Sequence, residues 1–136
     1  MTAELPVDDG NCFACGPNNP DGLHLVFTRE ADGSVHAQIT LDPKFQGWQG
    51  IAHGGIVMML LDEAMAHASG NAGERGMTAS MSVRFRQAVK LGVPLALHGR
   101  VKWKRGRVLG LEGTLSGPDG AVLATSEGNF VSAGAM

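Results

Sequence analysis

A glycine pair and a carboxylate eight residues later are the residues whose types and spacing suggest chemistry. Gly54 and Gly55 open an apolar run, which Asp62 and Glu63 interrupt. If the run is a helix, its first N–H groups have no partner within it, and its dipole makes that end positive. Because glycine lacks a Cβ, a ligand can approach these N–H groups, which can then stabilise a developing oxyanion. A tight loop-to-helix turn that only glycine fits explains the pair equally well.

The carboxylate of Asp62 is costly to bury in an apolar helix unless it is hydrogen-bonded or paired. The alternative is that the helix reaches the surface here and both acids are solvated. Adjacent helical residues point about 100° apart, so at most one of Asp62 and Glu63 shares a given pocket. Asp62 also lies about 12 Å beyond Gly54 along the axis. If both act on one small reacting group, they must come from different subunits of a symmetric dimer.

The hydrophobic pattern indicates the helix that must carry these residues. The segment from Ile56 to Ser69 contains no Gly or Pro and is rich in Met, Leu and Ala, which favour helix. Gly70 and Gly73 are expected to end the helix. Because its first two turns are apolar on all sides, we expect this helix to be buried on nearly every side.

Alternating apolar and polar residues predict strands on both sides of the helix. Two strands, 23–27 and 35–41, precede it as a hairpin with a turn at Asp32-Gly33, and four follow, near 79–86, 93–104, 109–116 and 122–131. The order ββ-α-ββββ favours an α+β fold in which a single antiparallel sheet curls around the helix. Residues 1–22, rich in turn formers, are expected to be an N-terminal lead-in to a single domain at 23–136. Edge-to-edge dimerisation would cover the exposed edge strands.

Composition and charge narrow the class of protein. The chain has 136 residues, 43% of them hydrophobic and 18% charged, with a net charge of −2. This balance indicates one folded domain and gives no reason to expect nucleic acid or an anionic membrane as partner. The start lacks a basic segment followed by an apolar run, and no apolar stretch reaches the roughly 20 residues of a membrane span. We therefore expect a soluble cytoplasmic protein.

Together these features resemble a known family. His53-Gly54-Gly55 opening a buried helix, with an acid nine positions after the histidine, resembles the hotdog-fold thioesterase superfamily. The branch with the phenylacetate-pathway acyl-CoA thioesterases is most similar, since the segments 11–16 (NCFACG) and 19–23 (NPDGL) also resemble it. The resemblance covers about residues 11–131 and implies a hotdog fold, an antiparallel six-stranded sheet wrapped around one long central helix. It also implies hydrolysis of an acyl-CoA to a carboxylic acid and CoA.

The resemblance further implies roles for individual residues. Asp62 matches the catalytic acid, acting as general base on water or as nucleophile. Gly54 or Gly55 matches the backbone donor that polarises the thioester carbonyl, and His53 matches an orienting residue near the site. Thr78 matches a hydroxyl that helps to hold water, although an ordinary strand-start threonine is the alternative. We expect no cofactor, because CoA is part of the substrate, and a homodimer, with a dimer of dimers left open.

Substrate-binding candidates are less sharply defined. Some relatives carry Asn six residues before the histidine, where this chain has Gly47 flanked by Gln46 and Gln49. Either glutamine is a candidate substitute, and Gln46 is the more plausible one. The CoA phosphates need basic partners. The candidates are Arg84 and Arg86, which share one strand face, and Lys104 and Arg105 in a basic hairpin, for which a solvated turn is the better explanation.

A metal site and two other functions are the remaining alternatives. Cys12 and Cys15 have the C-x-x-C spacing of zinc or redox sites, but no second pair exists and His24 is the only nearby ligand type. We therefore expect no metal. The two rival functions are a hotdog dehydratase or hydratase acting on the acyl chain, and a non-catalytic acyl-CoA-binding protein.

Overall fold

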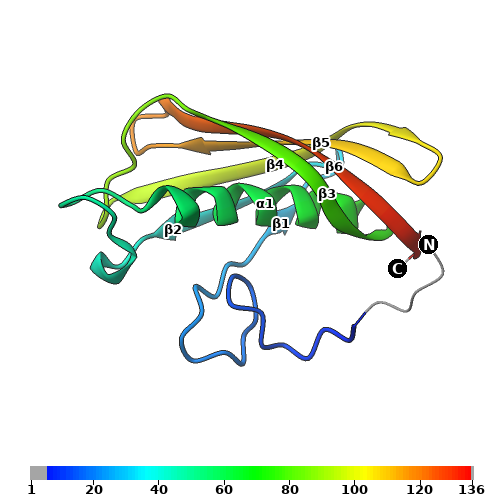
Figure 1. The fold of residues 1–136 in the computed structure, drawn as a ribbon, viewed down its shortest axis with the longest axis horizontal. Coiled ribbons are helices and arrows are strands. Elements are labelled where there is room, and N and C mark those ends of the chain that lie inside the picture. Colours follow the sequence, from blue (N-terminus) through cyan, green and yellow to red (C-terminus); the bar gives the residue numbers. More distant parts are fainter. Residues whose placement is uncertain (1–5, 136) are drawn as a thin grey trace.

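The computed structural model describes residues 6–135, which form one helix packed along one face of an antiparallel sheet (Figure 1). The elements follow the chain as β1 (Thr28–Arg29), β2 (Val35–Thr40), a short 3-10 helix η1 (Pro43–Phe45), α1 (Gly54–Asn71), β3 (Glu74–Phe85), β4 (Pro94–Arg105), β5 (Val108–Ser116) and β6 (Val122–Ala135). The six strands lie in the order β1-β2-β4-β5-β6-β3. The predicted α+β architecture, a six-stranded antiparallel sheet around one central helix, is confirmed.

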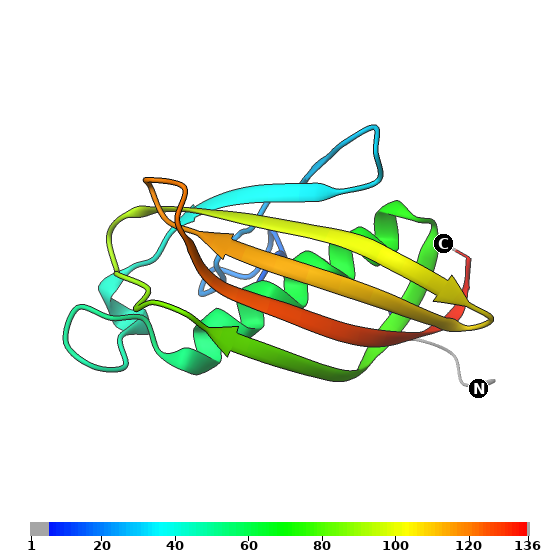
Figure 2. The same ribbon diagram turned by 90° about the horizontal axis from the view of Figure 1, so that it is seen from above.

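The two edges of the sheet differ greatly in length (Figure 2). β1 has 2 residues, whereas β3 at the other edge has 12. Among the described strands β3 pairs only with β6, so one side of its backbone faces outward. Long unpaired edges invite pairing with another chain, which makes β3 the edge that needs cover.

The core lies between α1 and the concave face of the sheet. Six helix residues have no exposed surface at all, namely Val57, Leu60, Leu61, Ala64, Met65 and Ala68. They pack against buried leucines of β4 and β5, including Leu97 and Leu115. The expectation of a helix buried on nearly every side is wrong for the single chain, because Gly54 and Gly55 are exposed and Met58 is 41% exposed. The sheet covers one side of α1 and leaves the face beside β3 open.

Small residues let the helix and the sheet approach backbone to backbone. A Cβ on Gly99 of β4 would lie 2.2 Å from the Ala64 carbonyl oxygen of α1. A Cβ on Gly113 of β5 would lie 2.7 Å from Ser126 Oγ and 3.3 Å from the Leu61 carbonyl oxygen. The position of α1 under the sheet therefore depends on these two glycines.

The predicted strand at 23–27 is wrong. The regular strand β1 begins only at Thr28, and His24 has a φ of 54°, which breaks an extended strand. The N–H groups of Leu23 and Leu25 instead donate to the carbonyl oxygens of Phe13 and Ala14, each at 2.9 Å. This segment therefore pairs with the lead-in, and it buries Ala14 and Leu25 in the core.

The other predicted elements are present with shifted ends. α1 begins at Gly54, two residues earlier than predicted, and ends at Asn71. Among residues 6–135, neither helix has the combined length and hydropathy of a membrane span.

Candidate functional site

The start of α1 is capped by the side chain of His53. Its Nδ1 accepts a hydrogen bond from the Gly55 N–H at 2.9 Å, and its carbonyl oxygen accepts from the Ile56 and Val57 N–H groups at 2.9 and 3.2 Å. No acceptor for the Gly54 N–H is found among the described residues. The donor that remains for a ligand at this positive end of the helix is therefore the N–H of Gly54.

Two adjoining hollows open at Gly54. One, of about 330 Å³, is lined by Val57, Phe85, Arg86 and their neighbours. The other is lined by Trp48, His53 and Phe85, and Trp48 is 85% exposed. A Cβ on Gly54 would lie 3.8 Å from the Phe85 ring, so a larger side chain would begin to fill the space between them. The exposed helix start thus borders two open hollows, which Trp48 and Phe85 also line.

Asp62 lies on the open face of α1 and contacts the edge strand. Its side chain is half-buried, and Oδ1 accepts a hydrogen bond of 2.7 Å from Thr78 Oγ1 on β3. No other hydrogen bond to this carboxylate is found among the described residues. The second oxygen, Oδ2, is therefore available to water or a substrate.

A bulge in β3 turns Thr78 toward Asp62. The pairing with β6 shifts between Thr78, which lies opposite Phe130, and Ser80, which lies opposite Asn129. Strict alternation would place Thr78 on the same face as Ser80, away from the helix. The extra residue, Ala79, reverses the faces and puts the hydroxyl beside the helix.

The glycine pair and Asp62 are not brought together within one chain. Both lie on the same straight helix, about 12 Å apart along its axis. The distance expected from the sequence is therefore kept in the folded chain.

The loop before the helix holds Gln46 and Gly47. Gln46 Oε1 accepts the Gly50 N–H at 3.0 Å, which closes the loop, so this side chain is already engaged. A Cβ on Gly47 would lie 3.0 Å from the Cα of His53. An asparagine at position 47 would therefore require the neighbouring His53 backbone to move by a few tenths of an ångström.

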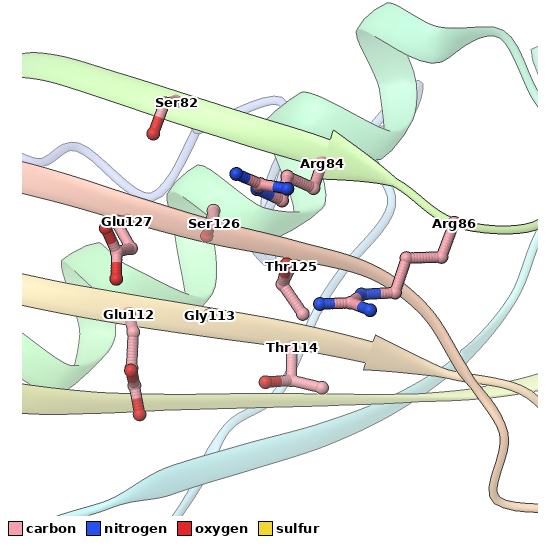
Figure 3. A pocket seen from close by; sticks show the side chains of 9 residues that line it. All are labelled: Ser82, Arg84, Arg86, Glu112, Gly113, Thr114, Thr125, Ser126 and Glu127. Carbon is pink, nitrogen blue, oxygen red and sulfur yellow. The ribbon is translucent and has the colours of Figure 1, made fainter.

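The basic candidates fall at opposite ends of the sheet. Arg84 and Arg86, near the end of β3, line a hollow of about 360 Å³ on the outer face, where Arg86 extends toward Thr125 and Thr114 (Figure 3). Arg86 also lines the hollow at Gly54. The turn between β4 and β5, after Lys104 and Arg105, lies beyond the other end of α1 (Figure 2).

Both hairpin residues already have partners. Lys104 forms an ion pair with Glu74, and the Arg105 guanidinium lies 5.5 Å from the centroid of the Trp103 ring. The Lys104 ammonium, and secondarily the Ser132 hydroxyl, lower the pKa of the Glu74 carboxyl.

Sequence reasoning missed the environment of Glu63. This acid lies beside Cys12 and Cys15 of the lead-in, and the two Sγ atoms and a Glu63 carboxylate oxygen all lie within 4.8 Å of one another. His24, the ligand type expected nearby, instead contacts the carbonyl oxygen of Asn19 through Nε2 at 2.6 Å. The C-x-x-C spacing was the available signal, but its third member comes from a distant helix.

Comparison with known proteins assigns the family. The family model of the thioesterase superfamily matches residues 49–124, which include Gly54, Asp62 and Thr78. The chain belongs to this superfamily, as its sequence predicts. A crystal structure of another thioesterase superfamily protein is 31% identical, has a TM-score of 0.86, and matches 96% of this chain and 68% of that one.

More distant solved structures share the fold. The PaaI protein of the phenylacetic acid degradation operon of Escherichia coli is 17% identical, with a TM-score of 0.77 over 84% of this chain and 83% of that one. A hypothetical thioesterase protein from Streptococcus pneumoniae, solved with coenzyme A, is 19% identical, with a TM-score of 0.77 over 82% of this chain and 90% of that one.

A curated relative is longer than this chain. An uncharacterized mitochondrial protein of Candida albicans is 32% identical over 111 residues, which is 80% of this chain and 49% of that protein. The chain therefore spans about half the length of the curated relative that it matches.

Proposed function

We propose that this protein is an acyl-CoA thioesterase, which hydrolyses an acyl-CoA to a carboxylic acid and CoA in sites shared by two copies of the chain. The observation that carries the proposal is the half-buried Asp62, held by Thr78 on the open face of α1 with one oxygen available. Membership of the thioesterase superfamily supports thioester hydrolysis as the reaction class. A CoA-bound structure with the same fold supports CoA as the carrier.

A second copy would cover the exposed edge of the sheet. β3 presents 12 residues at this edge, and beside it Met77 and Phe85 are 55% and 54% exposed. A long edge with large apolar side chains favours association over exposure to water. In a two-fold dimer through this edge, each helix start approaches the Asp62 of the partner subunit, which overcomes the separation within one chain.

The two halves of such a site perform complementary tasks. The Gly54 N–H and the helix dipole stabilise the negative charge that develops on the thioester oxygen. Asp62 removes a proton from a water molecule while the water oxygen attacks the carbonyl carbon. The tetrahedral intermediate then collapses with cleavage of the C–S bond. The CoA thiolate leaves and takes up a proton. If Asp62 instead attacks directly, water hydrolyses the resulting anhydride in a second step.

Arg86 is the best-placed basic residue for the CoA phosphates. It lines both the hollow at Gly54 and the outer hollow, with Arg84 beside it in the latter. Lys104 and Arg105 are bound to Glu74 and Trp103 at the other end of the sheet, so they are weaker candidates. The cytoplasmic location expected from the sequence stays a prediction.

A thiol-release assay tests the function. The protein is incubated with aromatic, short-chain and long-chain CoA esters, and free CoA is measured with a thiol reagent. We expect release from at least one ester, and a loss of at least about 10²-fold in kcat for Asp62→Asn with unchanged circular dichroism.

Three outcomes contradict the proposal. Binding of CoA esters without thiol release indicates a non-catalytic binder, and a new double bond or hydration product without thiol indicates a dehydratase or hydratase. Full activity in Asp62→Asn removes Asp62 from the mechanism.

A further inference from the structure

The lead-in and helix α1 bring together three potential metal ligands outside the proposed catalytic site. Cys12 and Cys15 are free thiols, each partly buried, and their Sγ atoms lie within 4.8 Å of each other and of a Glu63 carboxylate oxygen. Around a tetrahedral zinc ion such atoms lie roughly 3.6–3.8 Å apart, given Zn–S of about 2.3 Å and Zn–O of about 2.1 Å. If the distances between these three ligand atoms shortened by about 1 Å, the atoms would enclose an ion.

The turn that carries the two cysteines is tightly closed. The Gly16 N–H donates to the Cys12 carbonyl oxygen at 2.8 Å, and the Cys15 N–H points to Cys12 Sγ at 3.5 Å. A Cβ on Gly16 would lie 2.3 Å from the Cys12 nitrogen, so this turn requires glycine after the second cysteine. The turn presents both sulfurs to the same helix, and an N–H directed at sulfur stabilises a thiolate ligand.

A histidine one helical turn beyond Glu63 contacts its carboxylate. His67 Nε2 is 3.5 Å from Glu63 Oε2, and the imidazole stacks on Phe27 with ring centroids 4.3 Å apart. Two thiols and a carboxylate form a donor set suited to Zn²⁺ with water in the fourth position, and a histidine on a ligating carboxylate orients that ligand.

The electrostatics of the cluster favour a divalent cation. Among the described residues, Glu63 has no Lys or Arg as an ion-pair partner, and its one charged contact is with His67. Cys15, Glu63 and His67 also line an open hollow of about 520 Å³, which gives an ion a path from solvent.

We propose that Cys12, Cys15 and Glu63 bind a zinc ion that ties the lead-in to helix α1, and that His67 orients the Glu63 carboxylate. Each thiol loses its proton to solvent as it coordinates. Glu63 contacts the lead-in, whereas its neighbour Asp62 contacts β3. The ion therefore lies apart from the proposed catalytic acid and has a structural role. The proposal does not depend on thioesterase activity.

Metal uptake by the full chain is the test. Reduced, chelator-treated protein is titrated with Zn²⁺ against a chromogenic indicator, and with Co²⁺ as a spectroscopic probe. We expect one ion per chain, a thiolate-to-cobalt charge-transfer band, and protection of both thiols from a thiol reagent. The double variant Cys12→Ser/Cys15→Ser should abolish the band, and each single variant should weaken it. Glu63→Gln and His67→Gln should weaken binding roughly 10–100-fold.

The matched control is His24→Gln, which changes an imidazole outside the cluster and should bind like the wild type. Circular dichroism verifies that each variant is folded. If a variant is unfolded, the titration of the wild-type protein alone still tests whether the chain binds one ion. Reduced wild-type protein that takes up no stoichiometric ion overturns the proposal. A Co²⁺ spectrum without a thiolate band, or a Cys12–Cys15 disulfide that returns to unmetallated thiols on reduction, also overturns it.

Discussion

Thr78 and Asp62 illustrate how one side chain sets the chemistry of another. The hydroxyl donates to Oδ1 at 2.7 Å, which holds this oxygen of the carboxylate against β3 and leaves Oδ2 without a hydrogen bond among the described residues. Hydrogen bonds to a charged group contribute roughly 1.5–3 kcal/mol, so losing this one should matter to any reaction that Asp62 performs.

Replacement of Thr78 by Val removes the donor and preserves the shape of the side chain. We expect kcat for the best CoA ester to fall roughly 10–100-fold, which corresponds to the lost hydrogen bond. Thr78→Ser keeps a hydroxyl and should retain activity within a few fold. Steady-state kinetics on both variants provide the measurement, and equal activity of Thr78→Val and wild type would remove Thr78 from the site.

At the scale of elements, the approach of α1 to the sheet places Asp62 beside β3. Gly99 and Gly113 allow this approach, since a Cβ at either position would collide with the helix or with Ser126. The bulge at Ala79 then turns Thr78 toward the helix. The site therefore depends on backbone contacts remote from it.

Substitution of Gly99 by Ala tests this dependence. A Cβ only 2.2 Å from the Ala64 carbonyl oxygen meets backbone that cannot move without shifting the helix. We expect the free energy of unfolding to fall by about 3 kcal/mol or more. Urea denaturation measures the change, with Ala96→Ser on the exposed face of the same strand as a control expected within about 0.5 kcal/mol. A change as small as that of the control would contradict the close packing.

The ion pair between Glu74 and Lys104 links β3 to the end of β4. Because the pKa of Glu74 lies below its ordinary value of 4.5 in the folded chain, its ionised form stabilises the fold. This stabilisation is present above pH 4.5 and is lost as the pH falls through the lowered pKa. We therefore expect Glu74→Gln to lower the melting temperature at pH 7, and the difference from wild type to shrink in acid. Thermal melts from pH 7 to 3 provide the measurement, and a difference independent of pH would contradict the assignment.

At the scale of the whole molecule, the proposed reaction requires two chains. Gly54 and Asp62 lie on one helix at a separation of about 12 Å, and β3 offers an uncovered edge. A symmetric dimer would contain two equivalent sites, each with a glycine from one chain and an acid from the other.

Complementation between two inactive variants tests this arrangement. Asp62→Asn lacks the acid, and Gly54→Val fills the space toward the Phe85 ring, so each should be inactive alone. A mixed dimer has one intact site, because each chain contributes the half that the other lacks. After equal mixing and subunit exchange, we expect roughly a quarter of wild-type activity, since about half of the dimers are mixed and have one working site. A mixture that stays inactive after exchange, verified by gel filtration of tagged chains, would place each site within a single chain.

The sequence by itself determined the fold class and the family. Alternation of period two and one uninterrupted helical run predicted five of the strands and α1, because these signals depend only on neighbouring residues. The His-Gly-Gly start and the acid nine positions later predicted thioesterase superfamily membership, which the family match confirms. The roles of the individual site residues stay predictions.

Only the tertiary structure decided features that depend on contacts between distant segments. The predicted strand at 23–27 failed because the lead-in competes for its backbone hydrogen bonds. The bulge reversed the face of Thr78, which no local alternation could show. Glu63 lies 48 residues after Cys15 in the sequence (63 − 15). It completes a cluster with Cys12 and Cys15 only because the lead-in folds over the helix. Local pattern fixes which elements form, whereas their packing fixes which side chains meet.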